Sequence, residues 1–147
     1  MSSPVEVGFA TLAGRARAMM AAANVPPEHR RAMFPKACLH ATTIDGLVPE
    51  TIDGTTKTRY EWFHGHPPKW LNDLQQFGSA GTVVIKNRDI VPKSQNRGVT
   101  CVFVGFKANQ AAGTYSMWDL ATKGTHVTHD VTFLGGGHWT FDATQAL

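Results

Sequence analysis

The chain has few cysteines and no long apolar run, and each scarcity excludes a class of protein. Its 147 residues include only Cys38 and Cys101, too few for a disulfide framework or a four-cysteine zinc site. No apolar run approaches the roughly 18–20 residues that span a bilayer, and no secretory hydrophobic segment is found. We therefore expect an intracellular protein, nuclear or cytoplasmic, without a membrane span.

Charge of one sign is not in large excess either, which excludes a histone-like polycation. The net charge is +3, but its distribution is uneven. Residues 1–40 carry five basic and two acidic side chains, and residues 81–107 carry five basic side chains against Asp89 alone. Such a block either contacts phosphates or forms an ordinary solvated face, and charge alone favours neither interpretation.

The first half of the chain predicts helices. Apolar residues from Phe9 to Ala23 follow helical spacing, and Pro26-Pro27 ends that segment. A second helix is expected from about Glu28 to about Ile44, with a break or kink at Pro35. Residues 47–58 are expected to form an irregular connection, followed by a short helix over residues 58–63. The Ala- and Arg-rich start also resembles an organellar transit peptide, against which Glu6 weighs.

After Gly78 the apolar period approaches two, which predicts strands. Four runs are rich in Val, Thr and aromatic residues: Thr82–Lys86, Val99–Phe106, Thr114–Asp119 and Thr125–Phe133. Short strands at this density favour a small barrel over a large sandwich. The predicted class is α+β, with a helical part at 1–46, a linker with a short helix at 47–77, a small antiparallel barrel at 78–134 and a flexible tail at 135–147.

No catalytic constellation emerges from the residues themselves. His126 and His129 are three apart, so in one strand they would face opposite sides and share no metal. His64 and His66 have no third ligand nearby in the sequence. Cys101 is interpreted as a small core residue inside an apolar strand.

Six blocks, in order, resemble the integrase region of copia-type retrotransposon Pol polyproteins. The resemblance runs from about residue 4 to 134 and includes Thr11-Leu12, Ala16-Arg17-Ala18-Met19 and Asn24-Val25-Pro26 near the start. The later blocks are Thr56-Lys57-Thr58-Arg59-Tyr60-Glu61, Leu74-Gln75-Gln76-Phe77-Gly78, the run Arg97–Phe106, the run Gly113–Asp119 and the run Val127–Leu134.

This resemblance implies that residues 4–45 correspond to the last two helices of an integrase core and residues 78–134 to the SH3-like barrel that follows it. The family core binds divalent metal through two aspartates and one glutamate. Glu6 falls on the glutamate position, whereas both aspartates would lie before residue 1. The 147 residues alone are therefore expected not to integrate DNA, and Mg²⁺ would matter only if they were joined to a complete core.

The resemblance also implies weak, sequence-tolerant binding of DNA or RNA. The expected phosphate contacts are Arg15, Arg17, Lys86, Arg88, Lys93, Arg97 and Lys107. His129 stands where the family usually has an arginine, which removes one charge from the last strand.

Three functional hypotheses follow from the sequence. The chain is a non-catalytic integrase-like fragment, or a repurposed subunit that docks on a larger protein complex or on the rest of a Pol product, or an unrelated small enzyme. In the second hypothesis, the helices of residues 4–45 would expose their former core face to a partner. No acid–base or nucleophile set supports the third hypothesis.

Overall fold

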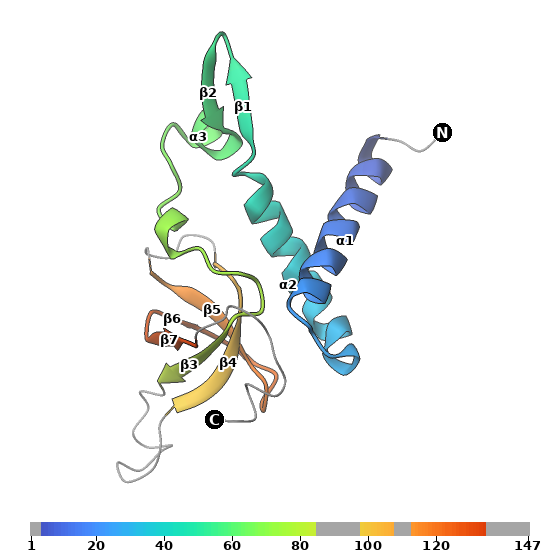
Figure 1. The fold of residues 1–147 in the computed structure, drawn as a ribbon, viewed down its shortest axis with the longest axis vertical. Coiled ribbons are helices and arrows are strands. Elements are labelled where there is room, and N and C mark those ends of the chain that lie inside the picture. Colours follow the sequence, from blue (N-terminus) through green and yellow to red (C-terminus); the bar gives the residue numbers. More distant parts are fainter. Residues whose placement is uncertain (1–3, 85–97, 108–112, 135–147) are drawn as a thin grey trace.

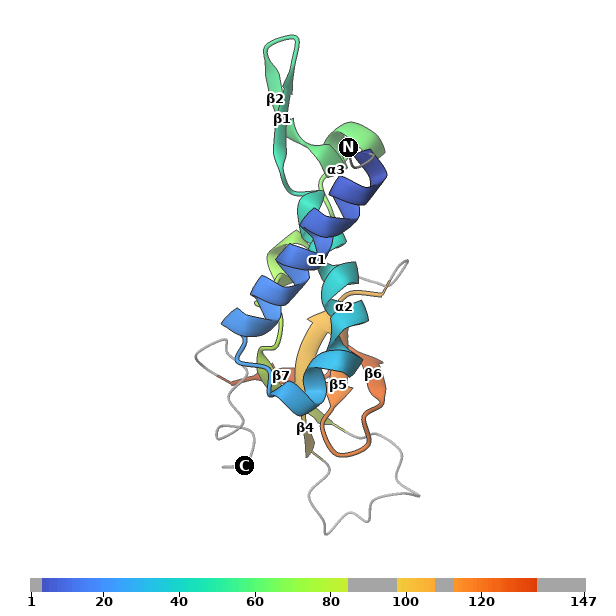
Figure 2. The same cartoon turned by 90° about the vertical axis from the view of Figure 1, so that its right-hand side faces the viewer.

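Two long helices open the fold. The computed structural model describes residues 4–84, 98–107 and 113–134, with side chains from residue 8 onward. Helix α1 spans Pro4–Ala22 and helix α2 spans Pro27–Asp45, as the helical spacing predicts. They lie in front of the sheet in Figure 2.

Of the break or kink expected at Pro35, the break is wrong, because α2 continues through this residue. A proline in a helix removes one N–H and therefore leaves the carbonyl group four residues earlier without its partner. That carbonyl group belongs to Arg31, and both Arg31 and Pro35 are exposed. The lost hydrogen bond thus lies on the solvent side, where water can replace it.

Residues 49–58 form a β-hairpin, so the expected irregular connection is also wrong. Strand β1 (Pro49–Ile52) pairs antiparallel with β2 (Thr55–Thr58). Asp53 and Gly54 both have positive φ, at 50° and 80°, which suits a two-residue hairpin turn. Nearly every residue of the hairpin is exposed, and it projects from one end of the molecule (Figure 1).

A short helix follows the hairpin, as expected. Helix α3 (Arg59–His64) begins where the Thr58 hydroxyl accepts a hydrogen bond from the Glu61 N–H, and it ends at Gly65 in the left-handed region. A single 3₁₀ turn, η1 (Leu71–Asp73), leads towards the sheet.

Five antiparallel strands build the second sheet: β3 (Ala80–Val84), β4 (Gly98–Gly105), β5 (Tyr115–Asp119), β6 (Thr125–Thr128) and β7 (Val131–Phe133). Their spatial order is β6-β5-β4-β3-β7. The prediction of one strand over residues 125–133 is wrong, because the chain turns at His129-Asp130. Strand β6 then pairs with β5, whereas β7 pairs with β3.

This strand order requires a curled sheet. Five strands in a flat sheet would hold the two edges about 19 Å apart, at about 4.8 Å per strand. The edge strands β6 and β7 are joined by only two residues. Because consecutive Cα atoms are 3.8 Å apart, the Cα atoms of Thr128 and Val131 can be at most about 11 Å apart in space. The sheet therefore bends until its edges approach each other. The pairings of the described strands leave it open, and they establish an α+β fold with antiparallel sheets.

Alternating residues of β4 and β5 supply two hydrophobic cores, one on each face of the sheet. Cys101, Phe103 and Met117 are buried on the inner face of the curl, together with Val83. On the outer face, Val102, Val104 and Trp118 pack against the two long helices, which contribute Ala16, Met20, Met33 and Ala37 to this core, and Ala23 joins it just after α1. The second half of β4 is therefore buried on both faces.

The outer core covers the apolar face of the two long helices. The apolar face that the docking hypothesis expects to be exposed is covered by the chain's own sheet. Residues 1–46 and 78–134, expected as separate parts, share this core.

Candidate functional site

The four most closely spaced predicted phosphate contacts lie outside the described residues. Lys86, Arg88, Lys93 and Arg97 belong to residues 85–97, between β3 and β4. Val84 ends β3 and pairs with Gly98, which begins β4. The described residues on either side of this segment therefore lie side by side at one end of the sheet.

Lys107 lies at the other end of β4. That strand has eight residues, which span roughly 25 Å at about 3.3 Å per residue. Lys107 lines a cleft together with Lys36, whose ammonium group donates a hydrogen bond to the Thr125 hydroxyl at 3.0 Å. Lys107 and Gly98, the first described residue after the segment 85–97, thus lie at opposite ends of β4.

Arg15 and Arg17 also differ in their surroundings. Arg15 forms an ion pair with Asp45, which also pairs with Arg59 at 3.1 Å. The hydrogen bond from Arg15 is the main reason that the pKa of Asp45 lies below its usual value. Arg17 is exposed and lies two residues further along the helix. Because Asp45 already balances Arg15, Arg17 is the better placed of the two for a phosphate.

Glu6, the family position for a catalytic carboxylate, lies near the beginning of α1. Its side chain is outside the described part of the structure, which therefore places no metal ligand there. Further along α1, Thr11 and Arg15 line a cleft with Thr42, Asp45 and Arg59.

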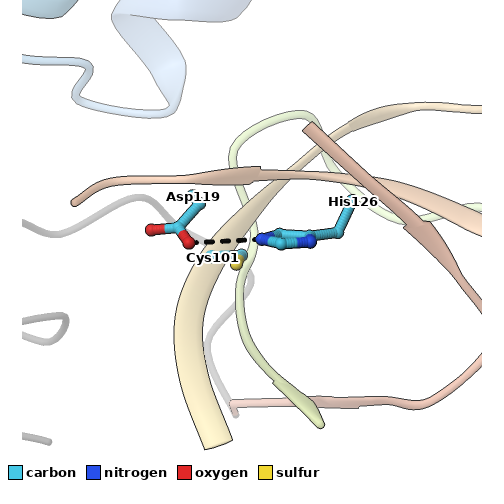
Figure 3. A group of neighbouring side chains, drawn as sticks. All are labelled: Cys101, Asp119 and His126. Atoms are coloured by element: carbon cyan, nitrogen blue, oxygen red, sulfur yellow. Dashed lines mark hydrogen bonds and ion pairs between the residues drawn. The ribbon is translucent and has the colours of Figure 1, made fainter. Parts of the chain in front are cut away.

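Three neighbouring strands bring together Cys101, Asp119 and His126. Cys101 on β4 pairs directly with Asp119 at the end of β5, and His126 lies on β6 beside β5. One ligand atom from each side chain lies within 4.8 Å of the others. Figure 3 shows the Asp119 carboxylate and the His126 ring in contact, with the sulfur of Cys101 close to both. Among the described residues, no other group of three such side chains meets this criterion.

Hydrogen bonds give the two oxygens of Asp119 different roles. Oδ1 accepts from the backbone N–H groups of Ala121 and Thr122, at 2.9 and 3.4 Å, in the turn between β5 and β6. Oδ2 lies 3.2 Å from Nε2 of His126. One oxygen therefore holds the turn, and the other faces the cluster.

Burial and hydrogen bonding act against each other in this cluster. Burial raises the pKa of the Cys101 thiol to about 12, with a further contribution from the Asp119 charge. Burial also tends to raise the pKa of Asp119, but the hydrogen bonds from His126, Ala121 and Thr122 outweigh it, and the net shift is downward. The cluster at rest therefore holds a neutral thiol beside an ionised carboxylate.

Sequence reasoning found parts of this cluster but not their grouping. Cys101 is buried in an apolar strand, as predicted. His126 contacts Asp119, whereas His129 lies 3.4 Å from Asp130 in the following turn, so the two histidines do not share a partner. The sequence signal that could have predicted the contact between Asp119 and His126 is the hairpin of β5 and β6. A turn at residues 120–124 brings position 126 back towards position 119.

His40 is a buried histidine that the sequence did not single out. It lies on α2 with 3% exposure, and its ring contacts those of Phe77, Phe103 and Phe106. Its Nδ1 atom is buried without a hydrogen-bond partner among the described residues. Burial lowers the pKa of His40 to about 4, so it is neutral at physiological pH.

Gly105 makes room for this ring. A side chain there would place its Cβ 3.3 Å from His40 Nδ1, and its φ of +126° favours glycine. Helix α2 can therefore approach the end of β4 closely.

Comparison of the chain with models of known protein families, with curated proteins and with solved structures finds no match. Within the described ranges, no helix has the length and apolarity needed to cross a membrane.

Proposed function

We propose that this chain is an integrase-like fragment that binds nucleic acid weakly and without sequence preference, and that it is not catalytic by itself. The observation that carries the proposal is the connection between β3 and β4. It holds Lys86, Arg88, Lys93 and Arg97 against the single acid Asp89, and both of its ends lie at one end of the sheet. Cations concentrated in this way neutralise phosphates without reading bases.

The strand order supports the integrase-like part of the proposal. Four consecutive strands form a meander, and the fifth returns to pair with the first. This is the order expected of the SH3-like barrel that the resemblance implies, and the curl of the sheet agrees with it. Two long helices precede the sheet, as residues 4–45 of the resemblance require.

The non-catalytic part of the proposal depends on Glu6. A two-metal site for phosphoryl transfer needs several carboxylates to hold its ions. The resemblance assigns only Glu6 to such a role within these 147 residues. If a complete core were joined to this chain, Mg²⁺ would bind through that core.

Salt dependence tests the binding. Four neutralised phosphates predict a slope of about −3.6 for the logarithm of the association constant against the logarithm of salt concentration. Affinity for a short DNA duplex, measured by fluorescence anisotropy, should fall roughly 100-fold from about 50 to about 200 mM salt. Replacing Lys86, Arg88, Lys93 and Arg97 with glutamine should abolish most of the slope.

The matched control replaces four described, exposed cations elsewhere with glutamine: Arg31, Lys57, Lys69 and Lys123. This variant has the same net charge as the test variant and should keep most of the affinity. Equal losses in both variants would show binding by net charge alone, and no binding at low salt would refute the proposal. Scrambling the duplex sequence should leave the affinity unchanged.

A second candidate is a subunit that docks on a larger protein complex or on the rest of a Pol product. Phe9 on α1 and Leu39 on α2 favour it, because they are 68% and 72% exposed although apolar. The mass of the complex purified from its host, before and after replacing both residues with serine, distinguishes the candidates. A stoichiometric protein partner lost in that variant would favour docking.

A further inference from the structure

We infer that Cys101, Asp119 and His126 form a binding site for a single divalent transition-metal ion of the zinc type. The inference rests on the placement of three different ligand atoms, within 4.8 Å of one another, on three adjacent strands. It is independent of the proposed nucleic-acid binding.

The ligand set selects the class of ion. Thiolate sulfur, imidazole nitrogen and carboxylate oxygen together suit zinc, whereas magnesium and calcium prefer oxygen ligands alone. Zinc binds these atoms at about 2.0–2.3 Å, so tetrahedral ligands lie somewhat less than 4 Å apart. His126 Nε2 and Asp119 Oδ2 are already 3.2 Å apart, and the Cys101 sulfur, within 4.8 Å of the other ligand atoms, would have to move by up to about 1 Å.

The backbone holds the ligands in place before any ion binds. Cys101 and Asp119 are directly opposed in the β4–β5 ladder, and His126 belongs to the next strand. The N–H groups of Ala121 and Thr122 orient the Asp119 carboxylate through Oδ1 and leave Oδ2 facing the cluster. Such support of a ligand by neighbouring hydrogen bonds is typical of metal sites.

The exposed fractions of the three side chains indicate the side from which an ion would enter. The side chain of Cys101 is fully buried and that of Asp119 is 7% exposed, whereas that of His126 is 41% exposed. The site is thus closed on the side of the inner core and open at His126. Three protein ligands leave the fourth tetrahedral position to water from that side. Binding displaces the thiol proton into solvent, so the ion binds more tightly as pH rises.

The chain offers matched controls for two of the ligands. Cys38 is the only other cysteine, and it lies half-buried on α2. His129 is three residues beyond His126 and contacts Asp130 instead of the cluster. The variants are therefore Cys101→Ser and His126→Gln, with Cys38→Ser and His129→Gln as controls.

The test is a titration of the chelator-treated full chain with Co²⁺ and, separately, with Zn²⁺ in competition with a chromophoric chelator. We expect one equivalent of Co²⁺ to bind with a thiolate-to-cobalt charge-transfer band, and Zn²⁺ to displace it and raise Tm. Both control variants should keep the band. Cys101→Ser should lose it, and His126→Gln should weaken zinc binding at least 10-fold.

Several results would overturn the inference. These are the absence of a charge-transfer band in the unmodified chain, loss of the band in Cys38→Ser instead, or unchanged zinc affinity in His126→Gln. His126 is half exposed, so its glutamine variant should fold even if Cys101→Ser does not.

Discussion

His40 shows how one residue can make stability depend on pH. Its ring is enclosed by aromatic side chains, and burial lowers its pKa from 6.5 to about 4. Unfolding returns the ring to water, where it binds a proton more readily. The neutral ring therefore favours the folded state above about pH 6.5, and this contribution is lost as pH falls towards 4.

We predict that the free energy of unfolding falls by about 2 kcal/mol from about pH 7.5 to about pH 5 because of His40. Urea unfolding of His40→Met, which removes the titrating ring, should show a fall smaller by that amount. Leu39 on the same helix provides the control, because it is exposed and does not titrate, so Leu39→Met should leave the pH dependence as it is. An equal fall in the original chain and in His40→Met would refute the prediction.

At the scale of elements, the curl of the sheet depends on close contacts across its inner face. Gly81 on β3 lies where a Cβ would be 3.0 Å from Val131 Cγ1, 3.2 Å from Met117 Cε and 3.3 Å from Phe133 Cδ1. Val131 and Phe133 belong to β7 and Met117 belongs to β5. These two strands are not neighbours in the sheet, and the curl brings their side chains together at Gly81. A side chain at this position would push the inner face apart.

Gly81→Val should therefore lower the free energy of unfolding by about 1–3 kcal/mol, as expected of overpacking in a filled core. Chemical denaturation measures the change. The matched control is Gly14→Ala in α1, where the new Cβ would meet no atom within 4 Å beyond its chain neighbours and the nearby backbone of its own helix. That substitution should stabilise the chain by about 0.5–1 kcal/mol, because alanine is the better helix former. Changes of the same sign in both variants would contradict this account.

At the scale of the whole molecule, helices and sheet are joined by the outer core. Met33 on α2 is fully buried in this core, which also contains Val102, Val104 and Trp118 from the sheet. Without the helices, these three side chains would face water. We therefore expect the helical pair and the sheet to unfold as one cooperative unit.

Met33→Ala should cost about 2–5 kcal/mol, the range for truncating a buried large side chain. Helical circular dichroism and amide protection of β4 should be lost at the same denaturant concentration, and both should shift together in the variant. Leu39→Ala on the same helix removes a 72% exposed side chain and should change stability by less than about 0.5 kcal/mol. Loss of helix signal while β4 stays protected would show two independent units.

The predictability of the fold follows from where each signal lies in the chain. Helices α1 and α2 and the strand-rich region after Gly78 were predictable, because apolar spacing and prolines are local signals. The hairpin of residues 49–58 was not, because its exposed strands lack apolar alternation and only Asp53-Gly54 marks the turn. The break at His129-Asp130 also escaped prediction, since both flanking segments are equally rich in strand-forming residues.

Of the two candidate sites, one has a local signal in the sequence and the other does not. The basic connection between β3 and β4 is visible in the sequence, because its cations are close together along the chain. The grouping of Cys101, Asp119 and His126 depends on strand register, which places position 101 opposite position 119. Residues 18 positions apart carry no local sign of that pairing.

The sequence by itself determined the two long helices, the strand-rich region after Gly78 and the places where charge accumulates, because these features depend on neighbouring residues. Only the tertiary structure decided which faces are covered and which side chains meet. The docking of α2 on β4 buried His40 against Phe103, and strand pairing brought Cys101 close to Asp119 and His126. The reason is physical: burial and contact between distant residues are set by how surfaces pack in space, which no short window of sequence contains.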